Sequence, residues 1–180
     1  SIVGNEGVVP FRIAPVGNPE KKSVLMKLEN STINGIETDI TFDTGAGVNI
    51  ISDSLANTLN LTRLDAYNNI LGIGLQKARY AIANEIRLGN ITVKDVPFVI
   101  VDFAVDNEEA DRYMDCLNLV VGGELMLQLK DLTIDFDKCE ITVPSVAPEK
   151  SSARPNMCFS PQMNLITKGV IHGNPMWICI

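Results

Sequence analysis

The chain has 180 residues, a net charge of −7 and an apolar fraction of 46%. This length suits one ordinary domain with room for part of another. The acidic balance argues against a nucleic-acid partner, because phosphate binding needs a basic surface, and no run approaches the roughly 18 apolar residues that a membrane span needs.

Short β-strands bounded by tight turns are predicted along most of the chain. In chain order they cover residues 24–32, 36–42, 48–51, 67–86 as a hairpin, 85–88, 91–93, 96–103, 119–121, 132–136 and 139–143. Asn34-Gly35 joins the first two and favours a type I′ turn, because both residues tolerate positive φ. Gly72-Ile73-Gly74 and Gly89-Asn90 mark two further hairpins. So many short strands predict an all-β fold that closes into a barrel.

Two short helices interrupt the predicted strands. The first follows Ser52, a residue that can cap it, and ends at Asn60, which suits a left-handed exit. The second covers residues 124–130, directly after Gly122-Gly123. Between the helices, the acidic stretch 102–115 is interpreted as a solvated loop, with a patch that selects basic partners as the alternative.

The C-terminal part contains a linker and an internal repeat. Composition shifts to Pro, Ser, Ala, Lys and Asn over 144–162, which is typical of a linker. Strand-like sequence resumes over 163–180, where Ile171 to Ile180 lies over Ile33 to Phe42 at a constant offset, since 171 − 33 and 180 − 42 are both 138. On this register the residue after Ile180 would correspond to Asp43. We therefore expect a first lobe over 1–143 and the opening hairpin of a second.

The cysteines do not predict a metal site. The four, at positions 116, 139, 158 and 179, have no CxxC spacing and no neighbouring His. They are interpreted as core thiols, and no cofactor is expected. The chain begins at Ser1 rather than Met, which leaves a cleaved export signal open and favours a periplasmic or extracellular location.

The candidate catalytic residue lies in the run from Ile40 to Ala46. There Asp43 stands directly between an apolar strand and the turn Thr44-Gly45. A buried carboxylate is costly unless it is paired, hydrogen-bonded or used. Two such turns face to face would bring together two carboxylates that cannot both ionise and so share one proton. One could then activate a water while the other hydrogen-bonds a substrate carbonyl. The alternative for Asp43 is a purely structural Asx turn.

This pattern resembles the retropepsin-like aspartic proteases over roughly residues 25–143. The resemblance is carried by Asp43-Thr44-Gly45-Ala46 after an apolar strand, by the Gly72-Ile73-Gly74 hairpin, and by Leu119 to Gly123 leading into a short helix. It implies a barrel-like lobe, a hairpin flap over a cleft, and peptide hydrolysis without a metal.

The resemblance also implies roles for individual residues. Asp43 would be the catalytic carboxylate, and Thr44 and Gly45 would form its turn. The substrate-binding positions would be Ala46, Gly72, Ile73 and Gly74, with Ile73 at the flap tip unless this is simply a flexible hairpin end. Gly123 would lie in the loop packed behind the Asp turn.

We therefore expect an aspartic endopeptidase that acts on a peptide or protein substrate. A second lobe or a homodimer partner would supply the other Asp, and the isolated chain would be weakly active or inactive without it. The alternative is a catalytically inactive retropepsin-like module for peptide binding or dimerisation.

Overall fold

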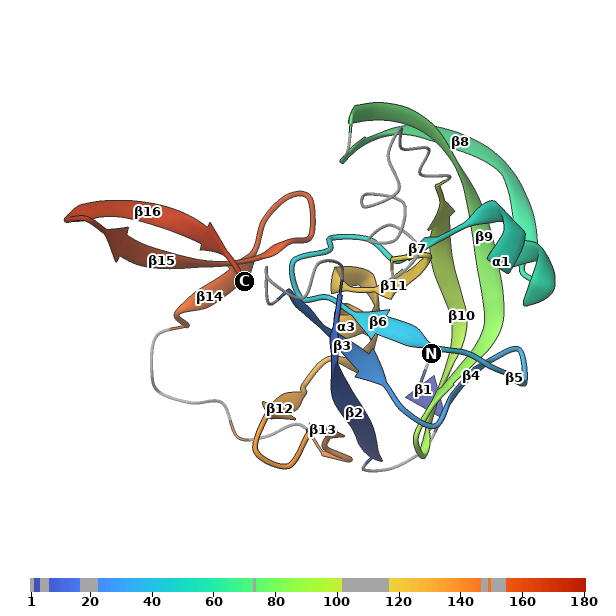
Figure 1. The fold of residues 1–180 in the computed structure, drawn as a ribbon, viewed down its shortest axis with the longest axis horizontal. Coiled ribbons are helices and arrows are strands. Elements are labelled where there is room, and N and C mark those ends of the chain that lie inside the picture. The colour runs from blue at the N-terminus through green and yellow to red at the C-terminus, as the bar shows by residue number, and fades with distance from the viewer. Residues whose placement is uncertain are drawn as a thin grey trace.

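The computed structural model describes residues 2–3, 7–16, 23–72, 74–101, 117–146, 149 and 155–180, with 2–3, 67–72 and 74–77 described by their backbone alone. The fold is mostly β with few helices. A large curled sheet forms a half-barrel, and a smaller sheet lies to one side of it (Figure 1). The expected all-β class is confirmed in this form, whereas closure of the barrel stays a prediction.

The large sheet contains 13 described strands. They are β1 (Ile2–Val3), β2 (Gly7–Pro15), β3 (Val24–Leu28), β4 (Ser31–Ile33), β5 (Ile36–Glu37), β6 (Ile40–Phe42), β7 (Ile50–Ile51), β8 (Thr62–Gly72), β9 (Gly74–Leu88), β10 (Ile91–Ile100), β11 (Leu119–Val121), β12 (Thr133–Asp135) and β13 (Glu140–Val143). Their order is β12-β13-β2-β3-β6-β11-β7-β10-β9-β4-β5, with β1 on β10 and β8 on β9. The smaller sheet has the order β14 (Met157–Phe159), β15 (Leu165–Ile171), β16 (Asn174–Cys179).

The first predicted turn has the expected backbone. Asn34 and Gly35 have φ values of 50° and 81°, and Ile33 pairs with Ile36 across them. The predicted strand 24–32 is nevertheless two strands, because Asn30 adopts a φ of 51° and redirects the chain. As a result β3 pairs with β6, while β4 pairs with β5 and β9.

Both predicted helices are present. Helix α1 (Asp53–Thr58) begins after Ser52, whose Oγ accepts a hydrogen bond from the backbone N–H of Leu55. Asn60 follows it with a φ of 54°, in agreement with the predicted left-handed exit. Helix α3 (Gly123–Leu129) begins directly after β11. In the part of the chain that the structure describes, no helix is long and apolar enough to cross a membrane.

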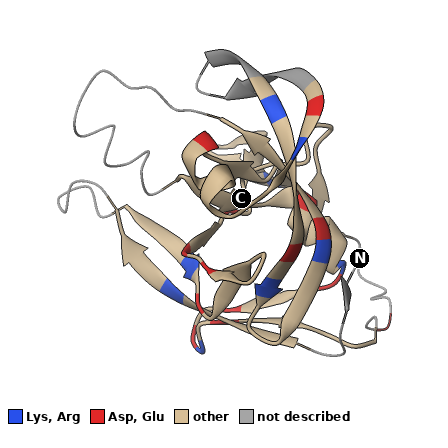
Figure 2. Cartoon of the chain, turned by 90° about the vertical axis from the view of Figure 1, so that its right-hand side faces the viewer, with Lys and Arg blue, Asp and Glu red and all other residues tan. Residues whose placement is uncertain are grey.

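The hydrophobic core lies inside the curl of the large sheet. Its largest fully buried side chains come from strands on both sides of the curl and from both helical segments: Val9, Ile33, Ile40, Ile51, Leu59, Ile86, Leu88, Ile91, Val93, Phe98, Leu125 and Ile141. Positions of basic residues, in blue, and of acidic residues, in red, are interspersed along the ribbon (Figure 2). Because the side chains of β6 and β11 are buried in this core, the core fixes the position of both strands, which carry the site described below.

Three further features of the fold differ from the sequence-based expectations. Strand β2 was not predicted, although it joins β13 to β3. Strand β14 lies within the predicted linker 144–162, where pairing with β15 orders residues that composition alone assigns to a linker. Cys158 and Cys179 are exposed rather than core thiols, because they lie on the smaller sheet, whereas Cys139 packs partly buried against the core. The acidic stretch 102–115 lies outside the described residues.

The Asn34-Gly35 turn leads to a first prediction. A Cβ on Gly35 would meet no atom within 4 Å, so Gly35→Ala should cost only the strain of a left-handed backbone, about 1 kcal/mol. Urea denaturation would measure this loss in the free energy of unfolding. Gly35→Asn is the matched control and should lose less, because Asn tolerates positive φ; equal stability of Gly35→Ala and wild type would contradict the prediction.

Candidate active site

Asp43 stands at the end of a buried strand. All three residues of β6 are buried, and the strand runs antiparallel to β3 and parallel to β11. The backbone N–H of Asp43 donates to the carbonyl of Val121 at 3.0 Å. Hydrogen bonding on both edges leaves β6 no freedom to shift, so the carboxylate leaves the sheet at a defined point and is half-buried there.

The turn after Asp43 closes on its own carboxylate. Asp43 Oδ1 accepts a hydrogen bond from the backbone N–H of Gly45 at 2.8 Å, and the carbonyl of Asp43 accepts from the N–H of Ala46 at 3.2 Å. A carboxylate held by a backbone N–H keeps a fixed orientation. The predicted residues Asp43 to Ala46 are therefore brought together in one compact turn.

Two glycines pack directly behind this turn. The N–H of Gly123 donates to the carbonyl of Ala46 at 2.7 Å. A Cβ on Gly122 would lie 2.2 Å from that same oxygen, and one on Gly123 would lie 2.9 Å from the carbonyl oxygen of Gly47. Any side chain at either position would push the turn away, so the packing expected of Gly123 is present and extends to Gly122.

Asn49, which the sequence analysis missed, holds the back of the site together. Its side chain is fully buried; Nδ2 donates to the carbonyl of Pro97 at 3.0 Å, and Oδ1 accepts from the N–H of Gly122 at 2.9 Å. The amide thus joins β10, the segment after the Asp turn and the loop before α3. The sequence did contain a signal for this role, because the polar Asn49 stands between Val48 and Ile50 in an apolar run. A polar side chain buried in such a run needs hydrogen-bond partners.

Glu124 lies beside Asn49 in the first turn of α3. Its Oε2 accepts a hydrogen bond from the backbone N–H of Asn49 at 3.4 Å. Burial raises the pKa of Glu124 above its ordinary value of 4.5, and the hydrogen bond from Asn49 opposes this only partly. The carboxyl behind the turn therefore favours its protonated form more than a solvated glutamate would.

The C-terminal segment lies against the Asp turn. Thr44 Oγ1 donates to the carbonyl of Ile180 at 2.8 Å, and Asn164 Nδ2 donates to the carbonyl of Gly45 at 2.6 Å. A Cβ on Gly47 would lie 1.9 Å from the carbonyl oxygen of Gln162. Residues at least 115 positions apart in sequence thus meet at this turn. Sequence analysis predicted neither Asn164 nor Ile180 as part of the site.

The predicted hairpin forms a separate element. Strands β8 and β9 pair antiparallel up to Gly72 and Gly74, which face each other at its end. Ile73, the predicted tip, lies outside the described residues. The structure therefore groups the predicted site residues in two places, with Asp43 to Ala46 in the turn and the two glycines at the end of the hairpin.

Among the described residues, no group of three or more His, Cys, Asp or Glu side chains could hold a metal ion.

A pocket of about 420 Å³ lies beside the turn, between α3 and the smaller sheet. Thr44, Met126 and Leu165 are among its lining residues. Among the described residues, the turn itself presents the oriented carboxylate of Asp43 and the hydroxyl of Thr44.

The chain is similar to a known protein family and to a solved structure. A family model described as aspartyl protease matches residues 30–123, which include the Asp turn, the hairpin and both glycines behind the turn. Among solved structures, the chain is similar to a retropepsin-like aspartic protease from Rickettsia conorii, at 16% identity and a TM-score of 0.46, with 79% of this chain and 91% of that chain covered. No curated protein sequence matches the chain.

Glu124 leads to a pH-dependent prediction. Because its folded-state pKa is raised, ionisation of Glu124 opposes folding at neutral pH, and this cost disappears as the pH falls below the unfolded-state value of 4.5. Glu124→Gln should therefore be more stable than wild type at about pH 7, and the difference should shrink at about pH 4. Urea denaturation at the two pH values would measure it. A difference that stays constant or grows toward acid pH would show that the prediction is wrong.

Proposed function

Since this chain belongs to the aspartyl protease family, we propose that it supplies the catalytic carboxylate Asp43 to an aspartic endopeptidase. One observation carries the proposal. Asp43 is held at the end of a buried strand by the N–H of Gly45, with the glycine loop packed behind it. A carboxylate that is oriented but still partly exposed can be reached by water and substrate.

The proposed reaction needs two carboxylates that share one proton. The ionised member takes a proton from a water molecule as the water oxygen attacks the scissile carbonyl carbon. The protonated member hydrogen-bonds the carbonyl oxygen and passes its proton to it. The first carboxyl then gives the water's proton to the amide nitrogen, while the second carboxylate takes a proton from a hydroxyl of the tetrahedral diol. The C–N bond breaks, the carboxylic acid and the amine leave, and the pair again holds one proton. In this scheme Asp43 is one of the two carboxylates.

We further propose that residues 163–180 are the counterpart of the first hairpin. His172 and Gly173 have φ values of 50° and 81°, the same as Asn34 and Gly35. In this register Ile180 corresponds to Phe42, the residue before Asp43. The hydroxyl of Thr44 reaches the carbonyl of Ile180, so the position next to Ile180 is where a second carboxylate would face the first.

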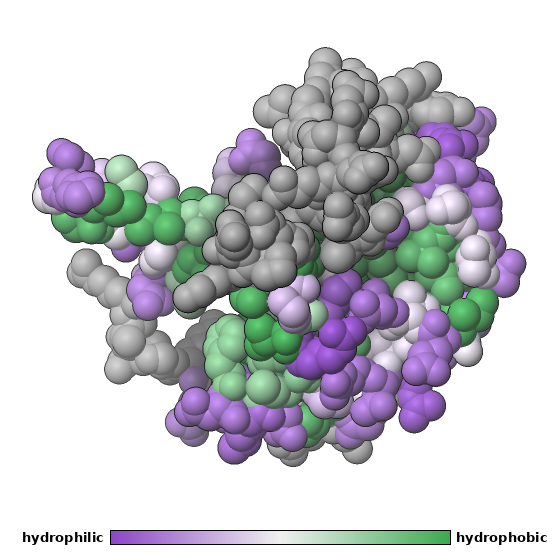
Figure 3. Space-filling model, viewed as in Figure 1, coloured by the Kyte–Doolittle hydropathy of each residue, from purple (hydrophilic) through white to green (hydrophobic). Residues whose placement is uncertain are grey.

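The exposure of apolar side chains along this hairpin supports the proposal that another lobe or chain covers it. Ile33 and Phe42 are 0% and 4% exposed in the first copy, whereas the corresponding Ile171 and Ile180 are 45% and 44% exposed. Figure 3 shows hydrophobic residues along the β15–β16 hairpin. The first copy is covered by its own lobe, so we propose that a second lobe or a partner copy covers the second and brings the other Asp.

The proposed substrate is an extended peptide. It would lie between the Asp turn at Ala46 and the β8–β9 hairpin, with Gly72, Ile73 and Gly74 as the covering flap. An extended peptide pairs its backbone with exposed strand edges and places alternate side chains in pockets. The competing function is a module that keeps the fold for peptide binding or dimerisation without cleavage.

The central test replaces the carboxylate. Asp43→Asn in the natural full-length protein should reduce peptide cleavage by at least about a hundredfold, because an amide cannot take the proton of the water. Asp137→Asn, at an exposed turn, is the matched control and should cleave as wild type does. A pepstatin-type inhibitor should raise the melting temperature of wild type and not that of Asp43→Asn. Cleavage that survives in Asp43→Asn would refute the proposal and favour the non-catalytic module.

The contact between Thr44 and Ile180 can be tested separately. Thr44→Val removes the donor, so the free energy of unfolding should fall by about 1 kcal/mol, and backbone amides at 178–180 should exchange faster. Thr44→Ser keeps the hydroxyl and should stay close to wild type in both measurements. If Val and Ser at this position behave alike, the hydroxyl contact does not hold the C-terminal hairpin at the turn.

A further inference from the structure

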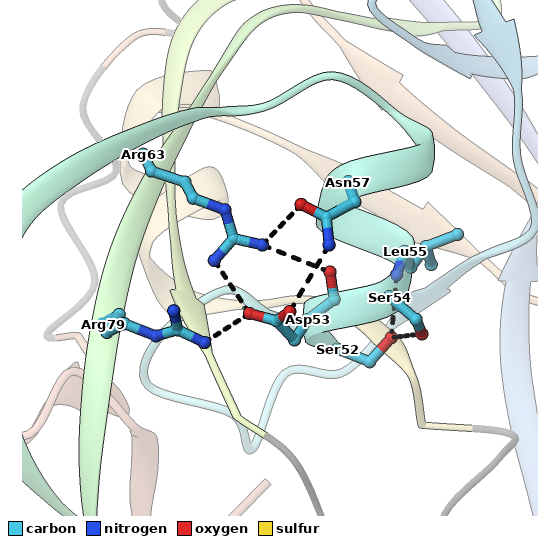
Figure 4. A network of polar contacts seen from close by, with 7 residues as sticks. All are labelled: Ser52, Asp53, Ser54, Leu55, Asn57, Arg63 and Arg79. Carbon is cyan, nitrogen blue, oxygen red and sulfur yellow. Dashed lines mark hydrogen bonds and ion pairs between the residues drawn. The ribbon is translucent and has the colours of Figure 1, made fainter.

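A polar network outside the candidate active site joins helix α1 to the base of the β8–β9 hairpin (Figure 4). At its centre is Asp53, the first residue of α1. Its Oδ1 accepts from Arg63 Nη1 of β8 at 2.8 Å and from Arg79 Nη2 of β9. One carboxylate therefore bridges both arms of the hairpin and ties them to the helix.

Asn57, one turn further along α1, orients this network. Its Oδ1 accepts from Arg63 Nη2 at 2.7 Å, and its Nδ2 donates to Asp53 Oδ2 at 3.4 Å. Arg63 Nη2 also reaches the carbonyl of Asp53 at 3.5 Å. Both terminal nitrogens of the Arg63 guanidinium thus have hydrogen-bond acceptors, and both oxygens of the Asp53 carboxylate accept hydrogen bonds.

The network lies where the hairpin ladder is irregular. Leu64 pairs with Tyr80 and Tyr67 pairs with Arg79, so two residues on β8 have no counterpart on β9. Such a bulge bends and twists a β-ribbon. Beyond it the two arms continue to Gly72 and Gly74. Arg79 is the first paired residue on the far side of the bulge, so the ion pairs hold the ribbon at its bend.

The charge of Asp53 persists into the acid range. The side-chain hydrogen bond from Arg63 has the largest effect and lowers the pKa of Asp53. Burial opposes it, but the positive charges of Arg63 and Arg79 and the hydrogen bond from Asn57 also lower this pKa, so the pKa is below its ordinary value. The carboxylate keeps its two guanidinium partners at a pH where unpaired carboxylates begin to lose their charge.

We propose that Asp53 is a positioning residue that sets the angle at which the β8–β9 hairpin leaves the sheet, and so the place of Gly72 and Gly74 relative to Asp43. This rests on the proposed function, in which the hairpin covers a peptide substrate. Exposed ion pairs contribute little to the stability of a whole domain. A two-stranded ribbon is only marginally stable by itself, so the same interaction has a large effect on how often the ribbon opens.

The first measurement is hydrogen exchange, which requires no activity. In Asp53→Asn, backbone amides at 67–72 and 74–79 should exchange about three- to fivefold faster than in wild type, because the lost ion pairs lower the local opening energy. Amides at the centre of β10 should be unchanged. The chain offers a matched control in Asp39, whose carboxylate also faces two cations, Arg12 at 3.0 Å and Lys27 at 3.3 Å. Asp39→Asn should leave exchange in the hairpin at the wild-type rate.

The second measurement is peptide cleavage by the full-length protein. Asp53→Asn should raise KM several-fold and change kcat less, since a hairpin that is held less well loses substrate binding before it loses the carboxylate chemistry. Asp53→Glu keeps the charge and should recover most of the wild-type KM. The Asp39→Asn variant should have wild-type kinetics.

Three outcomes would overturn the proposal: unchanged exchange in the Asp53→Asn hairpin, exchange that rises equally in β10, or faster hairpin exchange with unchanged KM. The first two show that the network does not position the hairpin, and the third shows that hairpin position does not affect substrate binding. Absence of cleavage by wild type would instead refute the proposed function, while the exchange data would still decide whether Asp53 holds the hairpin.

Discussion

The close packing of backbone on backbone behind Asp43 is the constraint on which the site depends. The parallel pairing of β6 with β11 brings Gly122 beside the Asp turn. A Cβ there would lie 2.2 Å from the Ala46 carbonyl oxygen, far inside van der Waals contact. With no side chain in the way, the N–H of Gly123 can bind that oxygen directly. The carboxylate is thereby held by main-chain atoms, which have little freedom to move away.

A buried amide supports this arrangement. Asn49 pays a desolvation cost that only hydrogen bonds can offset, and its partners belong to segments far apart in the chain. A network of this kind specifies one arrangement of those segments, because any slip leaves a polar group unsatisfied. On the other side of the turn, Thr44 and Gly45 bind the C-terminal segment. The turn is therefore held on one side by the glycines before α3 and on the other by Asn164 and Ile180. Asp53 in turn forms ion pairs with both strands of the β8–β9 ribbon.

Elements that depend on a few neighbouring residues could be predicted from the sequence. The Asn34-Gly35 turn and the Ser52 cap are local, since each is formed by interactions within four residues, and the structure has both. Strand breaks and strand partners were harder to predict. Asn30 split an expected strand through a single positive φ, and β2 was missed although it pairs with two strands. Such pairings depend on which sheet edge a segment meets, and alternating hydrophobicity does not encode that choice.

The sequence by itself determined which side chains the candidate site contains: an aspartate after an apolar strand, followed by a hydroxyl and a glycine, together with a similar hairpin pattern at a fixed offset. These are properties of short runs, and side-chain chemistry and turn preference are readable there. Only the tertiary structure decided what surrounds the carboxylate. The partners of Asn49, the contact of Thr44 with Ile180 and the bridge of Asp53 to two strands all join residues distant in sequence. Distance along the chain carries no information about such contacts, because they form only when the core has fixed the strands that bear them.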